Sequence, residues 1–138
     1  MMELKTGVVI AINAIRAYFV GHDVIVMPTG DGGANVIVEG VPLGAPYSQE
    51  TTWIGFLLSN ACPDDDTYPF YVTGELSRID GVALSAPLHS GNQFPPTAAP
   101  DEARAAVMVS RRQRNQSSFS HETPLRKLLT VLQWMLAQ

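Results

Sequence analysis

The run His89-Ser90-Gly91-Asn92 holds the side chains of this chain that are best suited to chemistry. A histidine and an asparagine held on a rigid loop can stabilise a developing oxyanion, because the amide donates a hydrogen bond to it. The same four residues also occur in loops that have no catalytic role. The run is therefore a candidate site only if the rest of the fold brings a reacting group to it.

The other potentially reactive side chains form no recognisable motif. The metal-ligand candidates are dispersed and match no zinc spacing; they are Cys62, His22, His89 and His121. The acidic run Asp64–Asp66 lacks the further ligands of a calcium loop and reads as a solvated loop. Pro28–Gly33 lacks the Lys-Ser/Thr of a phosphate-binding loop, and no Gly-x-Ser-x-Gly is present. We expect no metal and no cofactor.

Size and composition indicate one globular domain over residues 1–138. The chain is 46% hydrophobic and 16% charged, and it is long enough to bury a core without cross-links. A single cysteine excludes an intramolecular disulfide and fits a reducing compartment. The apolar run Gly7–Ile12 has no cleavage site after it, and no apolar stretch is long enough to span a bilayer. We therefore expect a cytoplasmic protein that does not bind membranes.

Charge is divided unevenly along the chain. Twelve of the 13 acidic residues lie in 1–103, and six of the nine basic residues lie in 104–138. This separation of acidic and basic residues suits docking to a charged partner, but the two parts can equally neutralise each other within the fold. Nucleic-acid binding is disfavoured because the net charge is −4 and the basic run is short.

The elements that must position these residues follow from hydrophobic periodicity and turn residues. Helical spacing predicts a helix over Leu4–Phe19, ended by Gly21. Four strands are expected after it: Val24–Met27, Asn35–Val41, Thr52–Leu58 and Pro69–Thr73. The turn Pro28–Gly33 should join the first two as a hairpin, because Asp-Gly and Gly-Gly tolerate positive φ.

The second half is less regular. Gly91–Asp101 holds three prolines and few apolar residues, so it predicts an irregular flap. Ala105–Ser110 is a short strand or extended segment. Thr123–Gln138 predicts a helix, with Thr123 as N-cap and Pro124 at the first position. The predicted fold is α+β: an N-terminal helix, a four-stranded antiparallel meander, the irregular flap and a C-terminal helix.

The segment Val36–Val72 resembles the central region of ubiquitin-conjugating (E2) enzymes. It reads V-I-V-E-G-V-P-L-G-A-P-Y, then T-T-W-I-G-F-L-L, then Tyr68-Pro69-Phe70. The family has a strand that enters a Gly/Pro turn with a tyrosine, and later a Tyr-Pro-Phe. The resemblance extends over Val24–Gln138 and implies the E2 (UBC-like) fold.

The resemblance implies a site downstream of these motifs. His89–Asn92 looks like an altered His-Pro-Asn loop, with one residue added and the proline lost. Phe119-Ser120 stands where the family has Trp-Ser, and counting back from it makes Ser110 the occupant of the nucleophile position. The stretch between His89 and Ser110 is longer than in the family, which puts their contact in question.

The chain departs from the family because no cysteine follows His89. Cys62 lies before Tyr-Pro-Phe, where a lone cysteine is more often a small buried hydrophobe. A serine hydroxyl is a poor nucleophile without a base, and His89 or His121 would have to supply one. The expected catalytic residues are therefore Ser110, His89, Asn92 and His121.

The expected partner-binding residues are Arg111, Arg112 and Arg114. Guanidinium groups beside Ser110 could hold an acidic surface or a C-terminal carboxylate. They could equally be the solvated end of a strand.

Two functions follow from the resemblance. In the first, the chain is an E2-like component of a prokaryotic ubiquitin-like conjugation pathway. It would bind a ubiquitin-like protein, accept its C-terminus from an E1-like enzyme as an oxyester on a serine, and pass it on. In the second, it is a catalytically inactive E2-variant-like scaffold that binds the ubiquitin-like protein or the E1-like enzyme. A third possibility is an unrelated α+β domain whose turn and proline motifs resemble those of E2 enzymes by chance.

Overall fold

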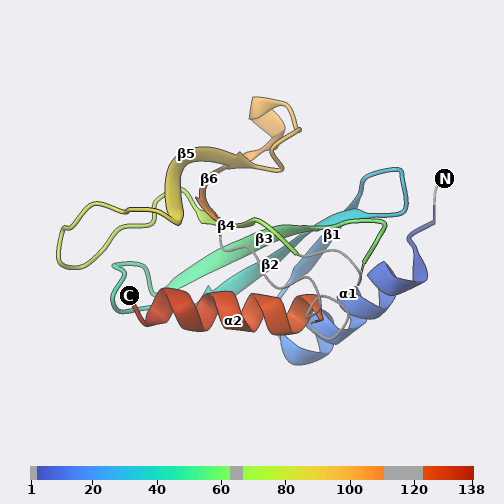
Figure 1. Cartoon of the computed structure of the whole chain (residues 1–138), viewed down its shortest axis with the longest axis horizontal. Coiled ribbons are helices and arrows are strands. Elements are labelled where there is room, and N and C mark those ends of the chain that lie inside the picture. Colours follow the sequence, from blue (N-terminus) through green and yellow to red (C-terminus); the bar gives the residue numbers. More distant parts are fainter. Residues whose placement is uncertain (1–2, 63–66, 111–122) are drawn as a thin grey trace.

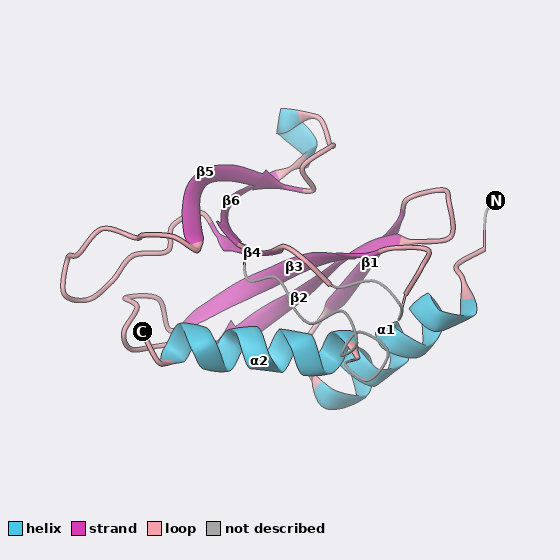
Figure 2. Ribbon diagram, viewed as in Figure 1, coloured by secondary structure: helices cyan, strands magenta, loops and turns pink. Residues whose placement is uncertain are grey.

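The computed structural model describes residues 3–62, 67–110 and 123–138. A six-stranded antiparallel sheet forms the centre of this part of the chain, and two helices cover one face of the sheet (Figure 1). The helices are α1 (Thr6–Tyr18) and α2 (Pro124–Leu136). On the opposite side of the sheet, a long hairpin rises away from the helices (Figure 2).

The strand order in the sheet is β1-β2-β3-β4-β6-β5. The first four strands form a meander, β6 pairs with β4, and β5 lies at the edge. Their bounds are β1 Val24–Pro28, β2 Ala34–Pro42, β3 Thr51–Leu58, β4 Phe70–Thr73, β5 Leu88–Phe94 and β6 Arg104–Val109. A short 3₁₀ helix, η1 (Pro100–Glu102), lies between β5 and β6.

The predicted four-stranded meander followed by an irregular flap is wrong. The sheet has six strands, and the run His89–Asn92 lies inside β5 rather than in a loop. β5 buries Leu88 and Phe94 at its ends, while the residues between them are polar and partly or fully exposed. An edge strand needs little apolar sequence, because only one side of it pairs and much of its surface meets water. The polar composition of β5 is the reason that the sequence pattern did not predict a strand there.

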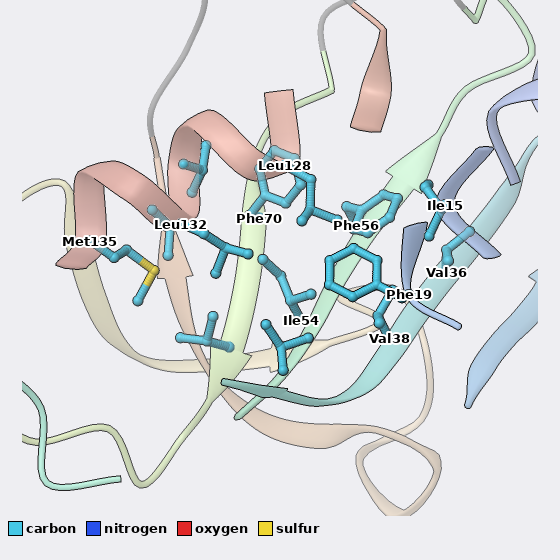
Figure 3. Packing of buried hydrophobic residues seen from close by; sticks show 14 of the residues in the cluster. Ile15, Phe19, Val36, Val38, Ile54, Phe56, Phe70, Leu128, Leu132 and Met135 are labelled. Carbon is cyan, nitrogen blue, oxygen red and sulfur yellow. The ribbon is translucent and has the colours of Figure 1, made fainter. Parts of the chain in front are cut away.

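Both helices pack on the sheet through apolar stripes. α1 buries Val8, Ile12 and Ile15, which follow helical spacing. The buried side chains of α2, among them Leu128, Leu132 and Met135, lie with them against alternate residues of the strands (Figure 3). The strand residues in this core include Val36, Val38, Ile54, Phe56 and Phe70. Cys62 is half-buried beside the same core, in keeping with its interpretation as a small hydrophobe.

The N-cap predicted for the C-terminal helix is confirmed. Thr123 accepts a hydrogen bond from the backbone N–H of Arg126 at 3.2 Å, and Pro124 occupies the first turn of α2. Among the described residues, no helix has both the length and the apolar character needed to cross a membrane.

Tyr47 fastens the turn between β2 and β3 to the end of α2. Its side chain is 1% exposed, and its hydroxyl donates to the carbonyl oxygen of Met135 at 3.0 Å. The turn itself closes through the N–H of Tyr47, which donates to the carbonyl of Gly44. The Gly/Pro turn with its tyrosine therefore has a structural role.

The hairpin of β5 and β6 folds over the face of the sheet that the helices leave open. Phe94 of β5 lies on Gly55 of β3, so closely that a Cβ at Gly55 would come within 2.7 Å of the ring. Arg104 of β6 reaches across to β2 and forms two hydrogen bonds with Glu39, of 2.8 and 2.9 Å. The same guanidinium lies 5.3 Å from the centre of the Trp53 ring. These contacts hold the hairpin in place.

Replacement of Tyr47 by phenylalanine should lower the free energy of unfolding by about 1 kcal/mol, because the buried hydrogen bond from its hydroxyl to the Met135 carbonyl is lost. Urea denaturation measures the difference. Tyr18→Phe is the matched control, since Tyr18 is 58% exposed and has no hydrogen bond from its hydroxyl among the described residues. Equal stability of the two variants would show that the Tyr47 hydroxyl does not anchor the turn.

The pair of Glu39 and Arg104 should make stability depend on pH. Hydrogen bonds from Arg104 lower the pKa of the Glu39 carboxyl below its ordinary value. The stabilisation is complete above the pKa of the unfolded state and is lost as pH falls through the lower folded-state pKa. Both side chains are more than a third exposed, so the contribution is at most about 1 kcal/mol.

Glu39→Gln should therefore show a smaller loss of stability than the wild type between about pH 5 and pH 3. Thermal unfolding across this range gives the comparison. Glu75→Gln is the control, because Glu75 is exposed and forms no ion pair among the described residues. Parallel pH curves for wild type and Glu39→Gln would contradict the expectation.

Candidate functional site: a histidine and a serine on neighbouring strands

Antiparallel pairing of β5 and β6 brings His89 to Ser110. His89 pairs with Met108, and Leu88 pairs with Val109. Met108 and Ser110 are two residues apart, so they face the same side of the sheet, and His89 is the diagonal neighbour of Ser110. The Nε2 atom of His89 lies 2.8 Å from the Oγ atom of Ser110. Two of the four predicted catalytic residues are therefore in hydrogen-bond contact.

Pro87 adds a second partner for the serine. Its carbonyl oxygen accepts the backbone N–H of Ser110 at 2.9 Å and lies 3.2 Å from the Ser110 hydroxyl. A hydroxyl has one proton, so it donates either to the imidazole or to this carbonyl. Only the first arrangement leaves His89 as an acceptor able to serve as a general base. Which of the two arrangements is present depends on the tautomer of the imidazole.

Asn92 shapes the strand that carries His89. The pairing of β5 with β6 shifts register between His89 and Asn92, and Gly91 has a φ of 79°, which favours glycine. The side-chain nitrogen of Asn92 donates to the carbonyls of His89 at 3.0 Å and Ser90 at 3.4 Å. These hydrogen bonds hold the bulge. A role for Asn92 as an oxyanion donor stays a prediction, and it would require one of these bonds to open.

The site is accessible from solvent. His89, Asn92 and Ser110 are each partly exposed. A triad would need a third group that orients the imidazole through Nδ1. Within residues 3–62, 67–110 and 123–138, no such hydrogen bond to Nδ1 of His89 is present. The described arrangement is thus a pair that can move a proton from a hydroxyl to an imidazole.

The remaining predicted residues are not placed. His121, Arg111, Arg112 and Arg114 lie outside the described residues, so their distances to Ser110 are not known. The described parts of the chain contain no group of three metal-ligating side chains.

The residues around Pro87 form no motif that predicts its contact with Ser110. The apolar residues Leu88 and Phe94, six positions apart on either side of a polar run, are the signal that could have revealed a strand.

No protein-family model, no curated protein and no solved structure matches this chain. The likeness to E2 enzymes therefore stays a prediction from residues, and the site has to be tested by its own chemistry.

The direction of the hydrogen bond between His89 and Ser110 can be read from the imidazole tautomer. We expect neutral His89 to have an unprotonated Nε2, because the serine hydroxyl donates to it. Long-range ¹H–¹⁵N spectra identify the tautomer, and Ser110→Ala should shift the Nε2 resonance of His89.

His22 is the internal control for that measurement. Its Nδ1 lies 2.9 Å from the carbonyl oxygen of Glu39, and a carbonyl only accepts, so Nδ1 must hold a proton. Its resonances should not respond to Ser110→Ala. A neutral His89 with the proton on Nε2 would contradict the general-base arrangement.

Proposed function

We propose that this chain is an E2-like component of a prokaryotic ubiquitin-like conjugation pathway, in which Ser110 accepts the C-terminus of a ubiquitin-like protein as an oxyester. The observation that carries the proposal is the 2.8 Å contact between His89 Nε2 and Ser110 Oγ. A serine becomes a useful nucleophile only beside a base, and the imidazole of His89 lies within hydrogen-bond distance of this serine. The proposed partners are the ubiquitin-like protein and an E1-like activating enzyme. The proposed compartment is the cytoplasm, without binding to nucleic acid or membrane.

The proposed reaction is a transesterification. Ser110 Oγ attacks the carbonyl carbon of a thioester between the ubiquitin-like protein and the E1-like enzyme. The new C–O bond forms, the C–S bond breaks, and the hydroxyl proton moves to His89 Nε2. The imidazolium then returns that proton to the departing thiolate. An oxyester is less reactive than a thioester, so onward transfer would be slower than from a cysteine.

Two observations favour the second candidate, a scaffold that binds the same partners without catalysis. The Asn92 amide is engaged within the bulge. The Ser110 hydroxyl is also within reach of the Pro87 carbonyl, which would withdraw its proton from His89. These three hydrogen bonds would also be expected if the two strands had only a structural role.

One experiment separates the two candidates. The chain is incubated with ATP, an E1-like enzyme and a ubiquitin-like protein, and the products are run on a gel. The acyl-carrier proposal predicts an adduct that resists thiols, is cleaved by hydroxide and is lost in Ser110→Ala. His89→Gln, which keeps a hydrogen-bonding side chain but removes the base, should slow adduct formation by about 10²- to 10⁴-fold.

Ser90→Ala and Cys62→Ala are the controls. Ser90 is exposed on the same strand, one residue after His89, and its hydroxyl has no hydrogen bond among the described residues. Both variants should form the adduct at the normal rate. An adduct that survives Ser110→Ala and disappears in Cys62→Ala would overturn the assignment of the nucleophile. Binding without an adduct would support the scaffold.

A further inference from the structure

A small hollow lies on the sheet face that the helices leave open. Its volume is about 270 Å³, and neither His89 nor Ser110 lines it. Its apolar walls include Leu57 of β3, Pro69 before β4 and Phe94 of β5. Leu57 is 43% exposed, which is high for a leucine within a strand. The hollow therefore offers apolar surface that the described part of the chain leaves uncovered.

Tyr71 places a polar atom in this hollow. The residue is only 7% exposed, and its hydroxyl has no hydrogen-bond partner in the described structure. No buried side-chain nitrogen or oxygen of the described residues lacks a partner, so the Tyr71 hydroxyl must keep access to solvent. The hollow that Tyr71 lines supplies that access. An otherwise buried phenol thus presents an unused donor and acceptor there.

The surroundings keep this phenol neutral. Burial raises the pKa of Tyr71, and the neighbouring Tyr68 raises it further. At neutral pH the hydroxyl is therefore protonated and able to donate.

Asn35 adds a second unused polar group. It is half-buried on β2, it lines the hollow, and its carboxamide makes no hydrogen bond within the described residues. A carboxamide presents a donor and an acceptor side by side, which matches a ligand edge with an adjacent C=O and N–H. No lining residue is charged. An ionic ligand would lose its hydration without gaining a counter-charge, so the hollow favours an uncharged one.

The spacing of the strands sets the size of the ligand. Asn35 is on β2 and Tyr71 is on β4, with β3 between them. Neighbouring strands lie about 4.8 Å apart, so the two backbones are about 10 Å apart. A ligand that contacts both side chains must therefore bridge the width of β3. The volume is at the small end for ligand sites, which agrees with a ligand of one or two rings.

We propose that this hollow is a binding site for a small, uncharged, planar ring compound with a lactam-type edge, held by Asn35 and Tyr71 and packed against Leu57 and Phe94. The site is separate from the pair of His89 and Ser110, so it stands whether or not Ser110 carries an acyl group.

The probe for the test is 2-quinolone, a fused ring with one lactam edge. Its matched controls are 1-methyl-2-quinolone, which lacks the N–H, and 2-naphthoate, which has a similar shape and a negative charge. In ¹H–¹⁵N titrations of the full chain, 2-quinolone should shift amides of residues that line the hollow. It should bind about fivefold more tightly than the methylated compound, the worth of about one hydrogen bond. The naphthoate should bind more weakly than both.

Variants locate the binding. Tyr71→Phe and Asn35→Leu should each weaken 2-quinolone binding by about three- to tenfold. Thr97→Trp changes an exposed residue of the lining and should block entry without disturbing the core. If Tyr71→Phe or Asn35→Leu fails to fold, Thr97→Trp still tests whether the ligand binds in the hollow. Tyr18→Phe and Ser110→Ala are controls that should bind normally.

The proposal is overturned if 2-quinolone and its methylated form bind equally, if no probe binds, or if the shifted amides lie away from the hollow. Normal binding by Thr97→Trp would also overturn it.

Discussion

The pairing of β5 with β6 is the constraint on which the candidate site depends. His89 and Ser110 are 21 residues apart in the chain, yet their side chains meet at 2.8 Å. The residues between them form the hairpin of β5 and β6. Because these strands pair antiparallel, the start of β5 and the end of β6 lie side by side whatever the length of the hairpin. The long stretch between His89 and Ser110 suggested from the sequence that the two residues would not be in contact. Here its antiparallel pairing is the reason that they meet.

The hairpin in turn depends on contacts across the open face of the sheet. Phe94 packs on Gly55 of β3, where a side chain would clash with its ring. Arg104 binds Glu39 of β2, which lies two strands from β4 in the sheet. The bulge at Gly91, fastened by Asn92, interrupts the pairing of β5 with β6 just after His89. The same fold-over places Phe94 beside Tyr71 and leaves the small hollow between the sheet and the hairpin. The position of the hairpin of β5 and β6 on the open face of the sheet therefore creates both the contact between His89 and Ser110 and the hollow.

Much of the local structure followed from the sequence, and the exceptions have physical reasons. The helices and the first four strands have strong periodicity and clear caps or turns, as Thr123-Pro124 and Pro28–Gly33 show. β5 was missed because an edge strand with a glycine bulge has almost no apolar pattern. The resemblance assigned His89 and Ser110 to one predicted site, but their contact depends on the pairing of β5 with β6. The role of Pro87, and the meeting of Asn35 with Tyr71, depend on backbone and strand pairings that no local pattern encodes.

We propose that His89 makes Ser110 nucleophilic. The most direct test uses no partner protein: the chain is treated with p-nitrophenyl acetate, and peptide mass spectrometry locates the acetyl group. We expect acetylation of Ser110 that disappears in Ser110→Ala and is strongly reduced in His89→Gln, with Ser90 unmodified. Acetyl groups confined to lysines, or equal labelling of Ser110 in wild type and His89→Gln, would contradict it.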